Sequence, residues 1–246
     1  MKYLRIAFDL LTTIPLRVSK DWKVGDSGRA AGWYSFVGLC LGGVVAAVYS
    51  LFGLYFSRLV TAAISLAIWV ALTGGLHLDG LADCFDGMFY AGNSERRLQI
   101  MKDSGVGAFG VVSLILILLV KFSVLSALSP SHAVGAILLS TSLARWCSTL
   151  AGTQPLARPD GMGADFVSGI KRPSLVVGAV IPLLLGIWLI PNGILAIFAG
   201  LLATMWILIM ARRNLGGITG DVLGMIIEIV ETIVLIAFGF LHGTVN

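Results

Sequence analysis

Seven apolar runs of about the length that crosses a lipid bilayer constrain this chain more than any other feature. The 246 residues are 57% hydrophobic and 12% charged, which is more apolar surface than one water-soluble core can hide. A membrane-spanning helix needs roughly 20 mostly apolar residues. Such runs cover residues 33–56, 59–76, 106–128, 132–151, 175–190, 193–211 and 221–241. The sequence therefore predicts an all-α fold in one domain, residues 1–246: a polytopic integral membrane helical bundle of about seven transmembrane helices.

Basic residues gather in the loops on one side of these runs, and this sets the expected orientation. Loops rich in lysine and arginine face the cytoplasm. With the amino terminus in the cytoplasm, the basic loops around residues 96–102, 158–172 and 212–213 all lie on that side, and only Arg58 lies clearly outside. Most acidic residues fall on the same side. We therefore expect a protein of the cytoplasmic (inner) membrane whose active site faces the cytoplasm.

The charge pattern also limits the partners. The net charge of +4 is spread over several loops with no basic and aromatic stripe, which argues against nucleic acid and favours contact with anionic membrane lipid. The three cysteines are scattered, without the paired spacing of a zinc site or a disulfide framework. The oligomeric state is not set by the sequence, and a homo-oligomer is compatible with it.

Three carboxylates follow the second apolar run. In a helix, spacings of four and three residues place Asp79, Asp83 and Asp86 on one face, where their charges repel one another. Such a cluster needs a cation, and oxygen ligands favour Mg²⁺ or Mn²⁺, which commonly bring a substrate phosphate. The alternative is a solvated helix whose acids pair with Arg96 and Arg97. We interpret the cluster as a metal site.

A second acidic segment opens the last apolar run. Gly217 and Gly220 lie in a glycine-rich turn, and glycine permits close backbone approach while the free N–H groups of a helix start can contact phosphate. Asp221 and Glu228 follow seven residues apart, nearly aligned on one helix face. Carboxylates inside a membrane span are costly and usually functional. This segment is therefore predicted to contribute further metal ligands.

Basic and hydroxyl side chains near these acids are candidates for phosphate binding. Lys102 and Ser104 precede a glycine-rich helix start, and Arg145 stands in the inner half of the fourth run. The formal G-x-G-x-x-G at residues 105–110 follows no strand, so a dinucleotide fold is rejected. The alternatives are a helix cap with a snorkelling lysine, and internal pairing of the span acids with Arg145 or Lys121.

These segments together resemble the cobalamin synthase family. The resemblance follows the chain in order through residues 74–83, 86–87, 100–104, 107–110 and 216–221. It implies a late step of cobalamin biosynthesis, in which adenosylcobinamide-GDP is joined to α-ribazole or its 5′-phosphate to give adenosylcobalamin or its 5′-phosphate and GMP. The reaction in this family depends on Mg²⁺, and both substrates are small molecules.

The residues and the resemblance together lead to one assignment of roles. The expected metal ligands are Asp79, Asp83, Asp86, Asp221 and Glu228. The expected catalytic residues are Asp83, Asp86 and His77, of which one accepts the hydroxyl proton; the alternative for His77 is a hydrogen-bonded residue at a span end. The expected phosphate-binding residues are Lys102, Ser104, Arg145, Gly217 and Gly220.

Two other classes of protein share parts of this pattern. A membrane enzyme similar to CDP-alcohol phosphotransferases or to prenyltransferases would also bind Mg²⁺ through aspartate-rich helices, and it would take a lipid-like substrate. An ion-coupled transporter would use acids at the membrane midplane between repeated halves. The acids here cluster at the cytoplasmic edge and no repeat is visible, which disfavours a transporter.

Overall fold

The computed structural model describes residues 1–14 and 22–240, so the end of the seventh run at Leu241 lies outside the described residues. The regular structure of the described residues is helical, apart from one isolated bridge between Leu156 and Ile218. The predicted all-α fold is confirmed.

Seven long helices form the body of the protein. They are α3 (Tyr34–Phe52), α4 (Arg58–Thr73), α7 (Ala108–Ala127), α8 (Pro130–Ala151), α10 (Arg172–Trp188), α11 (Asn192–Leu215) and α12 (Gly220–Phe240). Five helical stretches of the described chain are long and apolar enough to cross a membrane alone, and up to seven if two bent pairs each form one span. The bent pairs are α4 with α5 (Leu76–Met88), at 86°, and α9 (Met162–Gly169) with α10, at 98°. The expected number of about seven spans agrees with this range.

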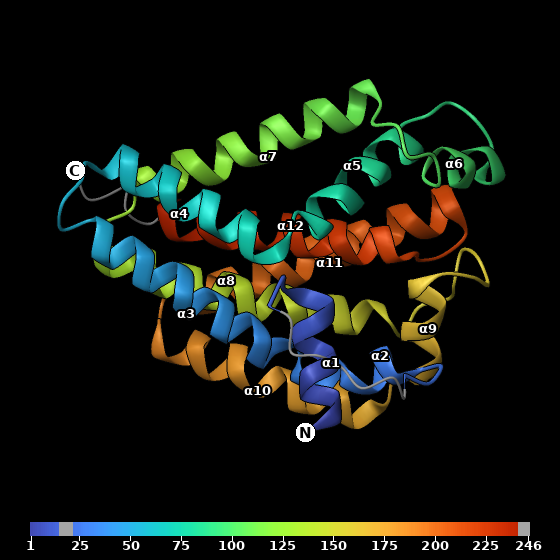
Figure 1. Cartoon of the computed structure of the whole chain (residues 1–246), viewed down its shortest axis with the longest axis horizontal. Helices are drawn as coiled ribbons and strands as arrows, with labels where there is room; N and C mark the ends of the chain where they lie inside the picture. The colour runs from blue at the N-terminus through green and yellow to red at the C-terminus, as the bar shows by residue number, and fades with distance from the viewer. Residues whose placement is uncertain (15–21, 241–246) are drawn as a thin grey trace.

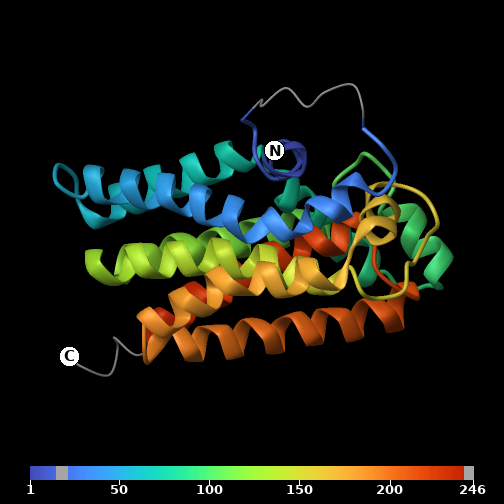
Figure 2. The same cartoon turned by 90° about the horizontal axis from the view of Figure 1, so that it is seen from below.

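The short helices gather at one end of the bundle. Figure 1 places α6 (Ser94–Ile100) and α9 at the end opposite the carboxyl terminus, with α2 (Asp26–Ala30) and η1 (Ala31–Trp33) nearby. The first helix, α1 (Lys2–Leu11), stands across the long helices in Figure 1 and is viewed down its axis in Figure 2, so it crosses the bundle. The segments that carry most chemical motifs therefore meet at one end of the molecule.

The centre of the bundle is formed by α8 and α12. Their most apolar stretches are 78% and 72% buried, whereas those of α7 and α11 are 28% and 33% buried. The outer helices expose large apolar side chains, such as Ile115 on α7 and Leu202 on α11. An outer surface of this kind suits contact with lipid chains, because hydrocarbon requires no polar covering.

Small residues allow the central helices to approach closely. Gly38 and Gly42 lie one turn apart on α3, and a Cβ atom on either would overlap Thr141 of α8. Packing of backbone against backbone through small residues four apart is a common way for membrane helices to associate. Because Gly38 and Gly42 have no side chain, α3 and α8 can pack backbone against backbone.

Candidate functional site

Helices α5 and α12 cross in direct backbone contact. A Cβ atom on Gly80 would lie 3.0 Å from the Cα atom of Asp221, and one on Gly224 would lie 3.3 Å from the Cα atom of His77. A Cβ atom on Gly80 would also come within 2.9 Å of the Asp221 carbonyl oxygen, so the close approach depends on glycine there, and the packing at Gly224 is tight. As a result, the first turn of α12 lies beside the middle of α5, and two acidic segments far apart in the sequence become neighbours.

This crossing forms the carboxylate cluster, defined as Asp79, Asp83, Asp86 and Asp221. The negative charges of Asp79, Asp221 and Asp86 all act on the Asp83 carboxyl, and the positive charge of Arg158 acts in the opposite sense. Asp83 is partly buried and Asp79 is exposed. The structure therefore brings together four of the five predicted carboxylates, all except Glu228, with an excess of negative charge.

Asp221 is held by two donors. The Thr219 hydroxyl donates to Asp221 Oδ2 at 3.0 Å, and Arg158 Nη2 donates to the same oxygen at 3.3 Å. Arg158 Nη1 is buried and has no hydrogen-bond partner. One guanidinium nitrogen beside the cluster is thus available to a further acceptor. Arg158 was not among the site residues predicted from the sequence.

A short pairing between two loops places Arg158 there. Ile218 N donates to the Pro155 carbonyl oxygen and Ala157 N donates to the Ile218 carbonyl oxygen, both at 2.9 Å. A Cβ atom on Gly217 would overlap the same Pro155 oxygen. Gly217, predicted to bind phosphate, therefore lies against this loop and permits the pairing that carries Arg158 to Asp221.

Asp86 caps the start of α7. Gly107 N donates to Asp86 Oδ2 at 2.7 Å, and Gly110 N donates to Asp86 Oδ1 at 2.9 Å. A Cβ atom on Gly107 would lie 2.5 Å from a carboxylate oxygen, and one on Gly110 would overlap the carboxylate. The N-terminal N–H groups of a helix attract an anion. The glycine-rich helix start that follows Lys102 and Ser104 thus holds the carboxylate of Asp86.

Lys102 and Ser104 lie in the exposed loop before α7. Lys102 Nζ is 2.9 Å from Asp160 Oδ2, and this contact joins the two long loops at this end of the bundle. The hydrogen bond from Lys102 lowers the pKa of the Asp160 carboxyl below its usual value. Gly220, the other predicted phosphate ligand, is the first residue of α12 and lies near Met162 and Gly163.

Arg145 and Glu228 lie in a separate cluster, the interior ion network, made of Lys121, Arg145, Glu228 and Glu231. Lys121 Nζ is 2.6 Å from Glu228 Oε2 and 2.6 Å from Glu231 Oε2, and Arg145 Nη1 donates to Glu231 Oε1. All four side chains are buried.

The structure therefore does not bring Arg145 or Glu228 to the carboxylate cluster. Glu228 lies about 10 Å along the α12 axis from Asp221, because seven residues rise by that length in a helix. Buried charges require partners. Internal pairing with Lys121, the alternative considered for the span acids, is the arrangement that the structure shows.

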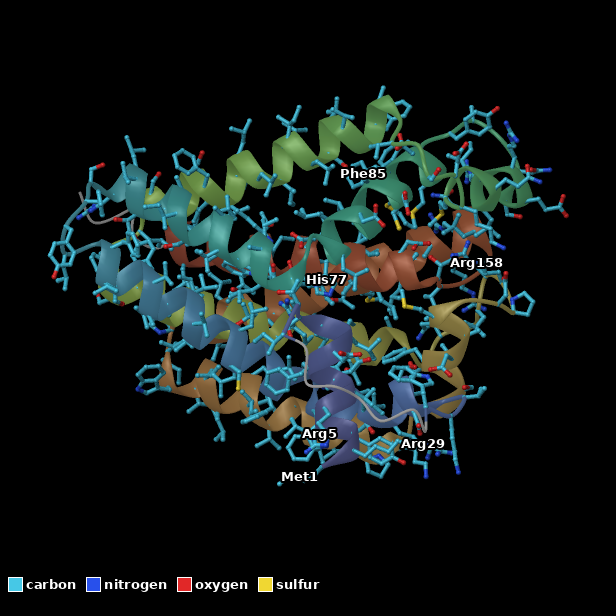
Figure 3. The ribbon with its side chains drawn as sticks, in the orientation of Figure 1. Met1, Arg5, Arg29, His77, Phe85 and Arg158 are labelled. Carbon is cyan, nitrogen blue, oxygen red and sulfur yellow. The ribbon has the colours of Figure 1, made fainter. Side chains whose placement is uncertain are left out.

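An apolar cavity of about 140 Å³ opens beside the carboxylate cluster. Its walls come from α1, α2, α3, α5, α8, α9 and α12, and they include Leu11, Tyr34, His77, Phe166 and Asp221. Figure 3 shows His77 near the middle of the molecule and Arg158 toward the end where α9 lies. His77 is only 4% exposed, and its Nδ1 atom has no hydrogen-bond partner.

The cluster can be tested for its fit to Mg²⁺. Within residues 1–14 and 22–240, no three His, Cys, Asp or Glu side chains enclose an ion by themselves. Mg²⁺, however, keeps several waters and commonly binds through one or two carboxylates plus a substrate phosphate. Asp79, Asp83 and Asp221 provide oxygen donors with excess negative charge at the edge of a cavity. These residues fit an ion that is shared with a phosphate ligand.

The fold and the site define a membrane-embedded, all-helical protein with a carboxylate cluster beside an apolar cavity. A family model described as cobalamin-5-phosphate synthase matches residues 3–239. The chain belongs to the cobalamin-5-phosphate synthase family, and the resemblance found in the sequence is confirmed.

Similar proteins cover nearly the whole chain. The adenosylcobinamide-GDP ribazoletransferase of Desulfitobacterium hafniense (strain Y51) is 40% identical over 98% of this chain and 98% of its own length. The protein of the same name in Pseudomonas aeruginosa (strain UCBPP-PA14) is 40% identical over 96% of this chain and 97% of its own. The protein of the same name in Clostridium acetobutylicum is 32% identical over 92% of this chain and 91% of its own length. No solved structure matches the chain.

Proposed function

We propose that this chain is an Mg²⁺-dependent adenosylcobinamide-GDP ribazoletransferase. It joins adenosylcobinamide-GDP to α-ribazole, or to α-ribazole 5′-phosphate, and yields adenosylcobalamin, or its 5′-phosphate, and GMP. The observation that carries this proposal is the meeting of the α5 and α12 carboxylates beside a cavity. Support comes from the similarity to ribazoletransferases along nearly the whole chain.

The reaction is a displacement at phosphorus. A ribazole hydroxyl oxygen forms a bond to the corrinoid-side phosphorus of the diphosphate, and the bond from that phosphorus to the bridging oxygen breaks. The electron pair of this bond leaves with GMP, and the hydroxyl proton is released. Such a step requires in-line positioning and neutralisation of the negative charge that develops on the bridging and leaving oxygens.

Different residues of the chain contribute to charge neutralisation, phosphate binding and positioning. Asp79, Asp83 and Asp221 would hold Mg²⁺, whose chemistry when bound is to neutralise charge on the diphosphate oxygens. Arg158, with one unpartnered nitrogen beside Asp221, is placed to bind a phosphate oxygen. Asp86 fixes the start of α7 against α5 through two backbone hydrogen bonds.

Of the three candidate proton acceptors, we assign this role to Asp83. Both oxygens of Asp86 already accept backbone hydrogen bonds, and His77 is buried in the cavity wall. The Asp83 carboxyl is partly exposed and lies among the other carboxylates of the cluster. It is therefore best placed to meet a hydroxyl group directed at a diphosphate held there.

The proposed location is the cytoplasmic (inner) membrane, with the amino terminus and the site in the cytoplasm. Arg97 contacts Asn214, Lys102 contacts Asp160 and Arg158 contacts Asp221, so the basic loops meet at the same end of the bundle as the carboxylates. Basic loops favour the cytoplasmic side. Water-soluble, negatively charged substrates would reach the cluster from this side.

The direct test uses the purified protein in detergent. With adenosylcobinamide-GDP, α-ribazole and Mg²⁺, we expect release of GMP, and we expect none when ribazole is omitted or Mg²⁺ is chelated. Absence of GMP under conditions in which the Pseudomonas aeruginosa relative is active would overturn the proposed function.

A further inference from the structure

A groove opens between α8, α10 and α11, at the end of the bundle where α8 and α11 finish and α10 begins. Its volume is about 390 Å³, and it shares no lining residue with the cavity beside the carboxylate cluster. Most of its wall is apolar and includes Leu150, Leu175, Leu201, Met205 and Leu208. No step of the displacement described above uses this groove.

The groove exists because α10 and α11 run apart from their hairpin. At the hairpin the two helices touch, since a Cβ atom on Gly193 would lie 2.8 Å from the Cα atom of Gly186. At its other end, α10 is tied to α8, where the Trp146 indole donates to a carbonyl oxygen in the first turn of α10 at 2.9 Å. The end of α11 is instead tied to α6 by the hydrogen bond from Arg97 to Asn214, and Figure 1 shows α11 running toward α6. The space between the diverging helices is left open.

Each wall of the groove changes from apolar to polar residues at the same end. On α11, Arg212 follows Leu208 by four residues and therefore lies on the same helix face. On α10, Arg172 precedes Leu175 by three residues and shares its helix face in the same way. Beyond α8, Gln154 lines this end as well. The groove thus combines an apolar length with a polar, basic end.

Neither arginine at this end has an acidic partner. Arg212 and Arg172 are both exposed, and the ion pairs among the described residues involve neither of them. Arg212 belongs to the groove lining itself. The guanidinium group presents a planar fork of donors that matches the oxygens of a phosphate. The charge at the end of the groove is therefore complementary to a phosphate group.

The groove also has the length of one lipid leaflet. On α11 its lining begins at Leu201 and ends at Arg212, and these eleven steps rise by about 16 Å along a helix axis. The hydrocarbon core of a bilayer is about 30 Å thick, so each leaflet contributes about half of that length. Helix α11 is an outer helix, and Met205 in the groove wall is 61% exposed. A hydrocarbon chain lying along α11 from Arg212 would reach the middle of the bilayer.

We propose that this groove binds an anionic phospholipid, with the phosphate on Arg212 and Arg172 and one acyl chain along α11. The two parts of such a lipid match the two parts of the groove, and basic pockets between membrane helices on the cytoplasmic side suit anionic head groups. A free phosphate would leave the apolar wall uncovered. The site does not depend on which reaction the protein catalyses.

The test measures lipid binding to the purified protein in a neutral detergent. Phosphatidylglycerol is titrated in, and bound lipids are counted by native mass spectrometry. Phosphatidylcholine with the same acyl chains is the control for charge, and glycerol 3-phosphate is the control for a free phosphate. We expect the first phosphatidylglycerol to bind at least about fivefold more tightly than phosphatidylcholine, which is the contribution of one basic residue beside anionic lipid. Glycerol 3-phosphate should not bind at these concentrations.

Matched variants test the two parts of the site separately. Arg212→Gln and Arg172→Gln should each weaken phosphatidylglycerol binding about fivefold, whereas Arg213→Gln, which is next to Arg212 but outside the lining, should not. Met205→Trp fills the groove and should weaken the binding of both lipids. Leu202→Trp, exposed on α11 outside the lining, is its control and should bind both lipids as the wild type does. If a variant does not fold, the wild-type comparison of the two lipids still decides.

Several results would overturn the inference. Equal affinity of the wild-type protein for the two lipids, or unchanged binding by both arginine variants, would remove the phosphate contact. The same loss in Arg213→Gln as in Arg212→Gln would show a diffuse surface charge without a site. Unchanged binding by Met205→Trp would place the lipid outside the groove.

The other possible occupants are visible in the same experiment. Glycerol 3-phosphate that binds as tightly as phosphatidylglycerol would make the basic end a site for free phosphate. A dimer that loses its lipid as it forms would place a second copy of the chain in the groove. Either result would overturn the inference. Because GMP release is not measured, none of these results bears on the proposed function.

Discussion

Gly80 lies directly against Asp221, and a Cβ atom at Gly80 would come within 2.9 Å of the Asp221 carbonyl oxygen. This contact holds the acidic faces of α5 and α12 together. The site of the proposed reaction thus depends on a position that has no side chain.

Replacing Gly80 with valine should separate the two helices and displace Asp221 from Asp79 and Asp83. We expect a loss of GMP release of at least about tenfold, and a destabilisation of about 1–3 kcal/mol from overpacking. Gly43→Val is the matched control, because Gly43 lies on α3 and a Cβ atom there would meet nothing within 4 Å. Normal activity of a folded Gly80→Val protein would contradict the role of this contact.

Asp86 should contribute to stability through its cap on α7. Asp86→Ala leaves the N–H groups of Gly107 and Gly110 without their acceptor, and loss of a helix cap costs about 0.5–2 kcal/mol. The expected result is a lower thermal unfolding midpoint in detergent. If the midpoint is unchanged while the Mg²⁺ requirement of GMP release rises steeply, Asp86 acts as a metal ligand and the cap is unimportant.

The interior ion network should respond to the balance of its charges. Glu231→Gln leaves both Arg145 and Lys121 with less negative charge, and breaking a buried ion pair costs about 3–5 kcal/mol. Lys121→Met combined with Glu228→Gln removes one charge of each sign and should unfold at a higher temperature than Lys121→Met alone. A double variant that is less stable than the single one would contradict charge pairing as the reason for this network.

The contact between Lys102 and Asp160 is exposed and should matter little for stability. Because the Lys102 ammonium lowers the pKa of Asp160, the carboxylate stays charged at neutral pH and loses the contact only as the pH falls through this lowered pKa. Asp160→Asn frees Lys102 and should leave GMP release intact.

Lys102→Met should raise the KM for the GDP-activated substrate if the lysine binds phosphate, and an unchanged KM would remove it from the phosphate ligands.

Much of the fold could be predicted from the sequence, because apolar length is a local property. Helices α3, α4, α7, α8, α10, α11 and α12 correspond to the seven predicted runs. The meeting of the two acidic segments also followed from chemistry, since carboxylates grouped on a helix face at a membrane edge need a shared cation.

The roles of individual charged residues were harder to predict. Arg158 reaches Asp221 only because residues 155–157 pair with Ile218, and no local pattern signals a contact between two irregular loops. At the start of α7, just after the predicted phosphate ligands Lys102 and Ser104, the chain itself supplies an anion as Asp86. For Glu228, a charge within a span favours function over internal pairing, and only the position of Lys121 in the structure shows the pairing.

The central claim is that carboxylates from α5 and α12 hold one magnesium-bound diphosphate. The most direct measurement is a Mg²⁺ titration of GMP release by the wild-type protein and by Asp83→Asn, Asp221→Asn and Glu95→Gln, where Glu95 is an exposed acid on α6. The account predicts that both aspartate variants stay folded and lose turnover or need at least about tenfold more Mg²⁺, while Glu95→Gln behaves as the wild type. Wild-type Mg²⁺ dependence in folded Asp83→Asn and Asp221→Asn would contradict it.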